Sequence, residues 1–206
     1  MNRHTGLLAA IVAATVIAHA GTLGGAVSTI SGTVKITGVA SNSNALVYVQ
    51  EAPGTFPPGT PVDMDQRAFT FTPHVLPVVA GTTVRFLNGD ATPHNVFSPD
   101  YEKYDLGTWQ QGQSKDYTFP ACAKPPCVYT QLCRVHSEMD AYVAVLQNPY
   151  FAVTDKAGHF EIGNVPPGSY TLGVWYASRT RRYKAQPRPV TVEAGEPVTV
   201  DLVVER

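Results

Sequence analysis

No stretch of the chain after residue 31 keeps the spacing of about 3.6 residues that an amphipathic helix needs. Apolar and polar residues instead alternate over short runs, as in residues 31–39 and 45–50. That alternation is typical of a half-buried strand. Frequent turns are supplied by 17 Gly and 17 Pro among the 206 residues. The sequence therefore predicts an all-β protein.

Further strands are expected at other short apolar runs. They are residues 65–71, 75–79, 84–88, 116–119, 128–132, 141–146, 151–154, 159–162, 170–175, 189–193 and 198–204. Residues 99–114 are rich in loop formers, and we expect no strand there. Residues 53–61 are rich in Pro and cannot form a central strand, so they predict a linker. Asn148-Pro149 marks a second boundary.

A thiol, an imidazole and a thioether follow one another directly after the expected strand 128–132. They belong to Cys133, His136 and Met139. A thiolate and an imidazole are two ligands of a trigonal His2Cys copper site, and Met is its weak axial ligand. His94, in a loop after strand 84–88, offers the second imidazole. The spacing predicts a copper site of these four residues. The alternatives are a partial zinc site or chance, although zinc makes little use of Met.

The chain has three cysteines: Cys122, Cys127 and Cys133. In an oxidising compartment an odd count leaves one thiol unpaired. The short loop between Cys122 and Cys127 favours a disulfide there, which frees Cys133 for a metal. A bridge from Cys133 to either of the others is the alternative. If residues 127–133 form one strand, its two ends lie too far apart for a Cys127–Cys133 bridge, which favours the Cys122–Cys127 pairing.

The first 20 residues are typical of an export signal. Arg3 is followed by an apolar run over residues 7–17 and by the small-residue sequence Ala18-His19-Ala20. We expect cleavage near Gly21, a periplasmic or secreted mature chain, and no membrane span in it. An uncleaved anchor is the alternative. The net charge of -1 argues against nucleic acid as a partner.

Residues 62–147 resemble the cupredoxins, the small blue copper proteins. The resemblance rests on residues 80–84, Asn88, residues 93–96 and the loop 133–139. Loop spacing is most similar to that of the amicyanins. The resemblance implies a Greek-key β-sandwich that holds one type 1 copper at His94, Cys133, His136 and Met139. It also implies transfer of single electrons between partner proteins, such as a c-type cytochrome or a dehydrogenase, and an exposed His136 ring edge.

Residues 148–206 resemble the carboxypeptidase-regulatory or transthyretin-like sandwich. Asp155, Gly158, Phe160 and residues 165–172 carry this resemblance. The opening strands of such a domain are similar to residues 31–50, which precede the copper domain. We therefore expect a discontinuous domain, residues 29–61 and 148–206, with the cupredoxin domain inserted between its halves. The arrangement resembles plastocyanin-like proteins labelled as methylamine-utilisation proteins. In the alternative, the N-terminal strand pair belongs to the cupredoxin domain.

One position departs from the cupredoxin pattern. Many cupredoxins have Ser or Thr after the Cys ligand, and its hydroxyl braces the Asn that follows the first His. Here Arg134 follows Cys133. Asn95 is still expected to donate its backbone N–H to the Cys133 sulfur, a contact that tunes a metal site. Which group, if any, holds the Asn95 side chain in place of that hydroxyl is left open.

Other roles compete with electron transfer. The chain could carry or store copper, or be a structural or binding β-protein whose copper domain does not function. Catalysis is disfavoured, because only His74 and His159 remain in the mature chain beyond the two expected ligands. Two more imidazoles are too few for a multinuclear copper cluster, and we predict no enzyme. Both are expected to be surface or packed residues.

Overall fold

The computed structural model describes residues 25–178 and 182–206, so the expected export signal lies outside the described residues. The described chain contains strands and no helix, which confirms the predicted all-β class. It therefore contains no helix long and apolar enough to cross a membrane. The strands are β1 (Ser28–Ile36), β2 (Ala45–Val49), β3 (Val62–Arg67), β4 (Thr70–Thr72), β5 (Val75–Val79), β6 (Thr83–Asn88), β7 (His94–Ser98), β8 (Tyr104–Trp109), β9 (Ser114–Thr118), β10 (Cys127–Leu132), β11 (Asp140–Leu146), β12 (Phe151–Val153), β13 (His159–Val165), β14 (Gly168–Tyr176), β15 (Lys184–Ala185), β16 (Arg188–Val192), β17 (Val198–Thr199) and β18 (Leu202–Glu205).

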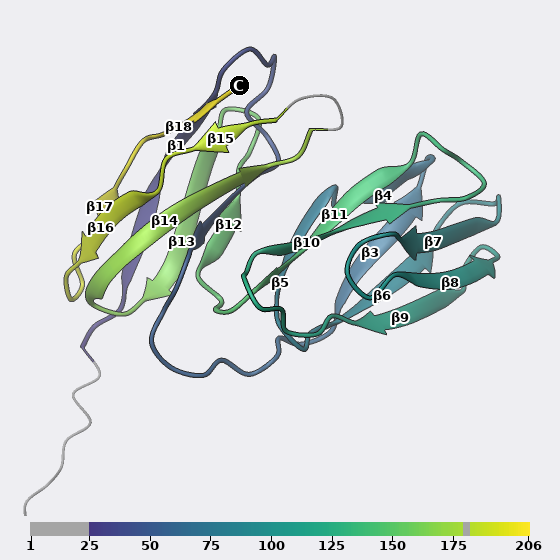
Figure 1. The fold of residues 1–206 in the computed structure, drawn as a ribbon, viewed down its shortest axis with the longest axis horizontal. Coiled ribbons are helices and arrows are strands. Elements are labelled where there is room, and N and C mark those ends of the chain that lie inside the picture. The colour runs from purple at the N-terminus through teal and green to yellow at the C-terminus, as the bar shows by residue number, and fades with distance from the viewer. Residues whose placement is uncertain (1–24, 179–181) are drawn as a thin grey trace, which may run out of the picture.

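The strands form two β-sandwiches that lie side by side (Figure 1). The terminal sandwich contains β1, β2 and β12–β18. One of its sheets has the order β13-β1-β18-β15, with β17 also pairing with β1, and the other has the order β12-β2-β14-β16. Strands from both ends of the described chain therefore share each sheet. β1 pairs in parallel with β18, and β2 lies between β12 and β14.

The central sandwich contains β3–β11. Its sheets have the orders β4-β3-β6-β9 and β5-β11-β10-β7-β8. The chain changes sheet between β4 and β5, and again at each of the next two connections, so that neighbours in space are distant in sequence. The parallel pairs β3–β6 and β5–β11 are products of these crossings. This is the Greek-key sandwich that the sequence predicted.

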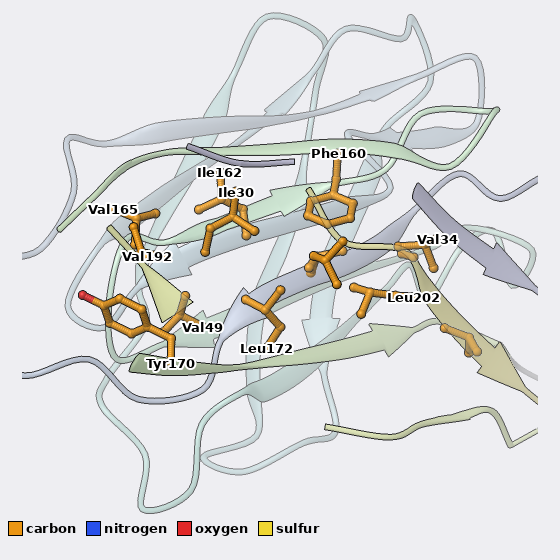
Figure 2. Packing of buried hydrophobic residues seen from close by; sticks show 14 of the residues in the cluster. Ile30, Val34, Val49, Phe160, Ile162, Val165, Tyr170, Leu172, Val192 and Leu202 are labelled. Atoms are coloured by element: carbon orange, nitrogen blue, oxygen red, sulfur yellow. The ribbon is translucent and has the colours of Figure 1, made fainter. Parts of the chain in front are cut away.

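Each sandwich has its own apolar core. In the terminal sandwich the side chains of Ile30, Ile162, Leu172 and Leu202 meet between the two sheets (Figure 2). The central core is built around Met64, Phe86, Phe119, Tyr129 and Val143. Strand β10 shows how the sequence builds it, because every second residue from Cys127 to Gln131 is buried. Period-two alternation points one face of the strand inward.

A third apolar cluster joins the sandwiches. It combines Leu46 and Tyr48 of β2 with Val75, Tyr142, Ala144 and Leu146 of β5 and β11. The two connecting segments lie against each other beside it: the Gln147 side chain donates to the Ala52 carbonyl (3.1 Å) and accepts from the Ala52 N–H (3.3 Å). The chain thus leaves and re-enters the terminal sandwich at neighbouring points.

Several local expectations were wrong. Residues 198–204 form two strands, β17 and β18, and His94 begins strand β7 instead of lying in a loop. Residues 65–71 form no single strand: β3 ends at Arg67 and β4 begins at Thr70. The turn residues Ala68 and Phe69 have positive φ values of 51° and 57°, a conformation that usually takes Asn or Gly, so no turn signal was visible. Residues 99–114 contain edge strand β8, which is half exposed and is held mainly by pairing with β7.

Gly158, in the turn between β12 and β13, should be the least replaceable residue of that turn. Its φ is +95°, and an added Cβ would lie 2.3 Å from the Val34 carbonyl oxygen. We expect Gly158→Ala to lower the free energy of unfolding by about 1–3 kcal/mol, measured by urea unfolding. Gly163→Ala is the control, because its Cβ would meet nothing within 4 Å. Equal losses in both variants would contradict this reading.

Candidate metal centre

Three adjacent strands of one sheet bring the predicted ligands together. His94 is the first residue of β7, and Cys133 directly follows β10, which lies between β7 and β11. Pairing of β10 with β7, at Leu132 and Phe97, sets Cys133 beside His94. His136 and Met139 lie in the turn from β10 to β11, which the Met139 N–H closes by donating to the His136 carbonyl (3.1 Å).

The donor atoms of three predicted ligands converge. Cys133 Sγ lies 3.9 Å from His94 Nδ1 and 3.9 Å from His136 Nδ1, and the two nitrogens are 3.1 Å apart. This is the one group of three or more potential metal ligands in the described chain. A triangle with these sides has a circumradius of about 2.1 Å, close to the metal–imidazole bond length of about 2.0–2.1 Å. One ion can therefore reach all three atoms.

The site is largely shielded from water. His94 is fully buried, and Cys133 and Met139 are 3% and 1% exposed. Met139 belongs to the same apolar cluster as Cys133, so the structure places it in the core beneath the turn. His136 is half-buried. Asn95 donates its backbone N–H to Cys133 Sγ (3.5 Å), the contact expected from the sequence.

Two of the three cysteines form a disulfide, and the third lies at the candidate metal site. Cys122 and Cys127 form a disulfide, the pairing that the short loop favoured. Cys133 is a free, buried thiol. The disulfide closes the loop before β10, so that strand begins at a cross-linked residue and ends at the metal-site thiol.

Asp90 is a site residue that sequence reasoning missed. Its carboxylate lies 2.9 Å from His94 Nε2, an atom that faces away from Cys133. A proton on Nε2 leaves Nδ1 with its lone pair free for a metal. The carboxylate also accepts the backbone N–H groups of Ala68 (2.7 Å) and Phe69 (3.0 Å). A carboxylate four residues before a ligand His was the available signal, but the sequence did not reveal the turn that Asp90 also holds.

Electrostatics favour the charged form of Asp90. Burial acts to raise its pKa, but the N–H of Phe69, the imidazole of His94 and the N–H of Ala68 together outweigh burial and lower the pKa. The carboxylate is therefore an acceptor for all three donors at neutral pH. It couples the turn between β3 and β4 to the ligand His94.

The same turn places an aromatic ring against the ligands. The Phe69 ring centre lies 4.9 Å from that of His136 and 5.7 Å from that of His94, edge-on in both cases. Phe69 is itself 45% exposed. The ring edge of His136 was expected to be open to solvent, and the structure gives a half-buried imidazole that is flanked by Phe69. The sequence could not show this, because Phe69 approaches through the tight turn.

The two remaining histidines have other partners. His74 Nδ1 contacts the Asp140 carbonyl oxygen (3.1 Å), and its ring packs edge-on against Tyr142. His159 pairs with Asp155 (3.3 Å) on the terminal sandwich. Neither joins the cluster of His94, Cys133 and His136.

Comparisons with known proteins give partial resemblances. The family model described as polysaccharide lyase family 4, domain II, matches residues 134–200, less than half of the chain. That segment runs from the ligand turn through β11 into the terminal sandwich. No curated protein matches the chain.

Solved structures with a similar fold each resemble part of the chain. A purple cupredoxin from Nitrosopumilus maritimus has 23% identity and a TM-score of 0.36, covering 41% of this chain and 98% of its own. The reduced form of an amicyanin mutant has 23% identity and a TM-score of 0.37, covering 47% and 86%. A copper-containing nitrite reductase from Thermus scotoductus SA-01 has 19% identity and a TM-score of 0.40, covering 56% and 28%. At these values the likenesses carry no argument about function.

Replacing Asp90 should destabilise the protein even without metal. In Asp90→Ala the buried His94 Nε2 and the N–H groups of Ala68 and Phe69 lose their acceptor. We expect a loss of about 1–3 kcal/mol of unfolding free energy, measured by urea unfolding of the copper-free chain. Asp116→Ala removes an exposed carboxylate from β9 of the same sandwich and should change stability by less than about 0.5 kcal/mol. Similar values for the two variants would refute the role of Asp90.

Proposed function

We propose that this chain is an exported type 1 copper protein that carries single electrons between redox partner proteins. One observation carries the proposal: two imidazole Nδ1 atoms and one free thiol sulfur converge at the buried end of a β-sandwich. Met139 lies in the same turn and core, where a weak axial ligand would be supplied.

The donor set fits copper better than other metals. Thiolate, two imidazoles and a thioether suit copper, whereas magnesium and calcium prefer oxygen ligands. Zinc takes Cys and His but has little use for a thioether. His94, Cys133 and His136 would hold the ion, and Met139 would supply the thioether. The half-buried carboxylate of Asp90 hydrogen-bonds the far nitrogen of His94, so it orients that imidazole from the side opposite Cys133.

The protein's part in electron transfer is to keep this frame unchanged. Bound copper supplies a centre that alternates between two oxidation states. β7 and β10 fix His94 and Cys133 through sheet pairing, and Asp90 fixes the orientation of the His94 ring. Asn95 donates to the Cys133 sulfur and stabilises its charge. Burial keeps water from the thiolate, while half-buried His136 and the Phe69 ring lie where a partner would approach.

The proposal extends to the organisation of the chain. We propose a cupredoxin domain over residues 62–147, inserted into a transthyretin-like domain formed by residues 29–61 and 148–206, after an export signal over residues 1–20. Sharing of sheets between β1–β2 and β12–β18 supports the insertion. The Cys122–Cys127 disulfide is consistent with a periplasmic or secreted location. A c-type cytochrome or a dehydrogenase is the proposed class of partner.

The site offers no second metal for catalysis. His74 and His159 are engaged elsewhere, and the described residues contain no further cluster of potential ligands. Electron carriage by one ion is therefore the function that the geometry supports best.

A copper titration of the mature chain tests the proposal. We expect an intense visible thiolate-to-copper band that saturates at one copper per chain and survives repeated reduction and reoxidation. Binding should weaken as pH falls, because protons compete for the thiolate and the imidazoles. Cys133→Ala should abolish the band, and the double variant Cys122→Ala with Cys127→Ala should keep it.

Three results would count against the proposal in different ways. No band from a chain whose Cys133 is demonstrably free would remove the copper carrier. Copper that leaves the chain on reduction, so that the band does not return on reoxidation, would favour copper transport or storage. A band that persists in Cys133→Ala would show that copper binds at another site.

A further inference from the structure

The residue after Cys133 cannot brace the site with a hydroxyl, and the structure shows what replaces it. Arg134 uses its backbone N–H to donate to Asn95 Oδ1 (3.3 Å). Its side chain turns to β8, where Nε donates to Asp105 Oδ2 (2.7 Å). The guanidinium lies 4.2 Å from the centre of the Phe97 ring, which fixes its plane.

The other oxygen of Asp105, Oδ1, contacts the neighbouring strand β7 and its own strand β8. Asp105 Oδ1 accepts from Asn95 Nδ2 (2.7 Å) and from the Gly107 N–H (2.9 Å). Asn95 Nδ2 also donates to the Gly107 carbonyl (2.8 Å). β7 and β8 lose their regular register between Asn95 and Phe97. This irregularity, with Gly107 at a φ of +76°, lets the Asp105 carboxylate face Asn95.

All polar atoms of the Asn95 side chain are thereby held. Asn95 is 2% exposed, so its own end of each of these contacts is shielded from water. A side chain held at both its oxygen and its nitrogen fixes the adjacent backbone, and that backbone N–H donates to Cys133 Sγ. Hydrogen bonds to a ligand sulfur tune affinity and potential.

We infer that Asp105 is a positioning residue of the candidate metal centre: through Oδ1 it locks Asn95 on the strand of His94, and through Oδ2 it ties β8 to Arg134 in the loop of Cys133. It replaces the hydroxyl brace that Arg134 cannot supply. The consequence for copper rests on the proposed function, whereas the consequence for the thiol does not.

The contacts of the two Asp105 oxygens contribute unequally to holding the site. The Arg134–Asp105 pair is solvent-exposed, with side chains 59% and 39% exposed. An ion pair of this kind contributes little in water. The Oδ1 contact reaches a buried amide, where a lost partner is costly. Asp105→Asn keeps an acceptor oxygen for Asn95 and loses the ion pair, whereas Asp105→Ala loses both. Comparing the two isolates the Asn95 contact.

The chain provides a matched control. Asp63 on β3 pairs with Arg85 on β6 in the same sandwich, with side chains 45% and 51% exposed. Asp63→Ala removes the same charge and a comparable ion pair, but Asp63 touches neither Asn95 nor the ligand turn. Effects of lost charge or lost surface pairing should appear equally in Asp63→Ala and Asp105→Ala.

The first measurement uses the copper-free full chain, so it does not depend on metal binding. Cys133 is buried, and its reaction rate with an aromatic disulfide reports opening of the ligand loop. We expect Asp105→Ala to react at least about tenfold faster than wild type, and Asp105→Asn and Asp63→Ala to stay within about twofold. If Asp105→Ala does not fold, Asp105→Val, which suits a strand and offers no acceptor, takes its place.

The second measurement uses the copper-loaded chain. Asp105→Ala should bind copper about 10- to 100-fold more weakly, with a displaced thiolate-to-copper band and a shifted midpoint potential. Asp105→Asn and Asp63→Ala should keep the affinity, the band position and the potential of the wild type. Asp105→Ala indistinguishable from Asp63→Ala would overturn the inference. So would equal changes in Asp105→Asn and Asp105→Ala, because the Asn95 contact would then not matter. A wild-type chain without a copper band refutes the proposed function alone, and the thiol rates still decide the role of Asp105.

Discussion

Pairing between β7 and β10 is the constraint on which the candidate metal centre depends. It sets the first residue of one strand beside the residue that follows the other, so that His94 and Cys133 meet although they lie 39 positions apart in the sequence. His136 then needs only the short turn after Cys133 to complete the triangle. A shift of register would point one donor away from the others, because neighbouring residues of a strand face opposite sides.

Two carboxylates, those of Asp90 and Asp105, hold the side chains at this candidate site in place by hydrogen bonds. Asp90 holds the outer nitrogen of His94 and the backbone of the Phe69 turn, and Asp105 holds Asn95 and Arg134. Each joins a ligand-bearing segment to a segment that carries no ligand. The donors are therefore positioned by hydrogen bonds from outside the ligand loop as well as by the loop itself. Such support from behind the ligands is what keeps a metal site unchanged during a reaction.

The terminal sandwich provides the frame that carries the centre. Because β1–β2 and β12–β18 share sheets, the connections to the central sandwich enter and leave at neighbouring points. The apolar cluster around Leu46, Val75 and Tyr142 joins the sandwiches on the side of β5 and β11. The turn that carries His136 and Met139 leads directly into β11, whose Tyr142, Ala144 and Leu146 belong to this junction.

Local patterns in the sequence determined the all-β class, the strand before Cys133 and the strand after Met139, the choice of His94, Cys133 and His136 as candidate ligands, and the favoured disulfide. These follow from alternation, Gly and Pro placement, and ligand spacing, which are properties of neighbouring residues. The turn at Ala68–Phe69, edge strand β8 and the roles of Asp90 and Asp105 were decided only by tertiary structure. Ala68 and Phe69 carry no turn signal of their own, and the acceptor that stabilises their left-handed backbone is Asp90, about 20 residues away. A carboxylate in the sequence does not reveal which donors it will meet, since those donors are gathered by strand pairing.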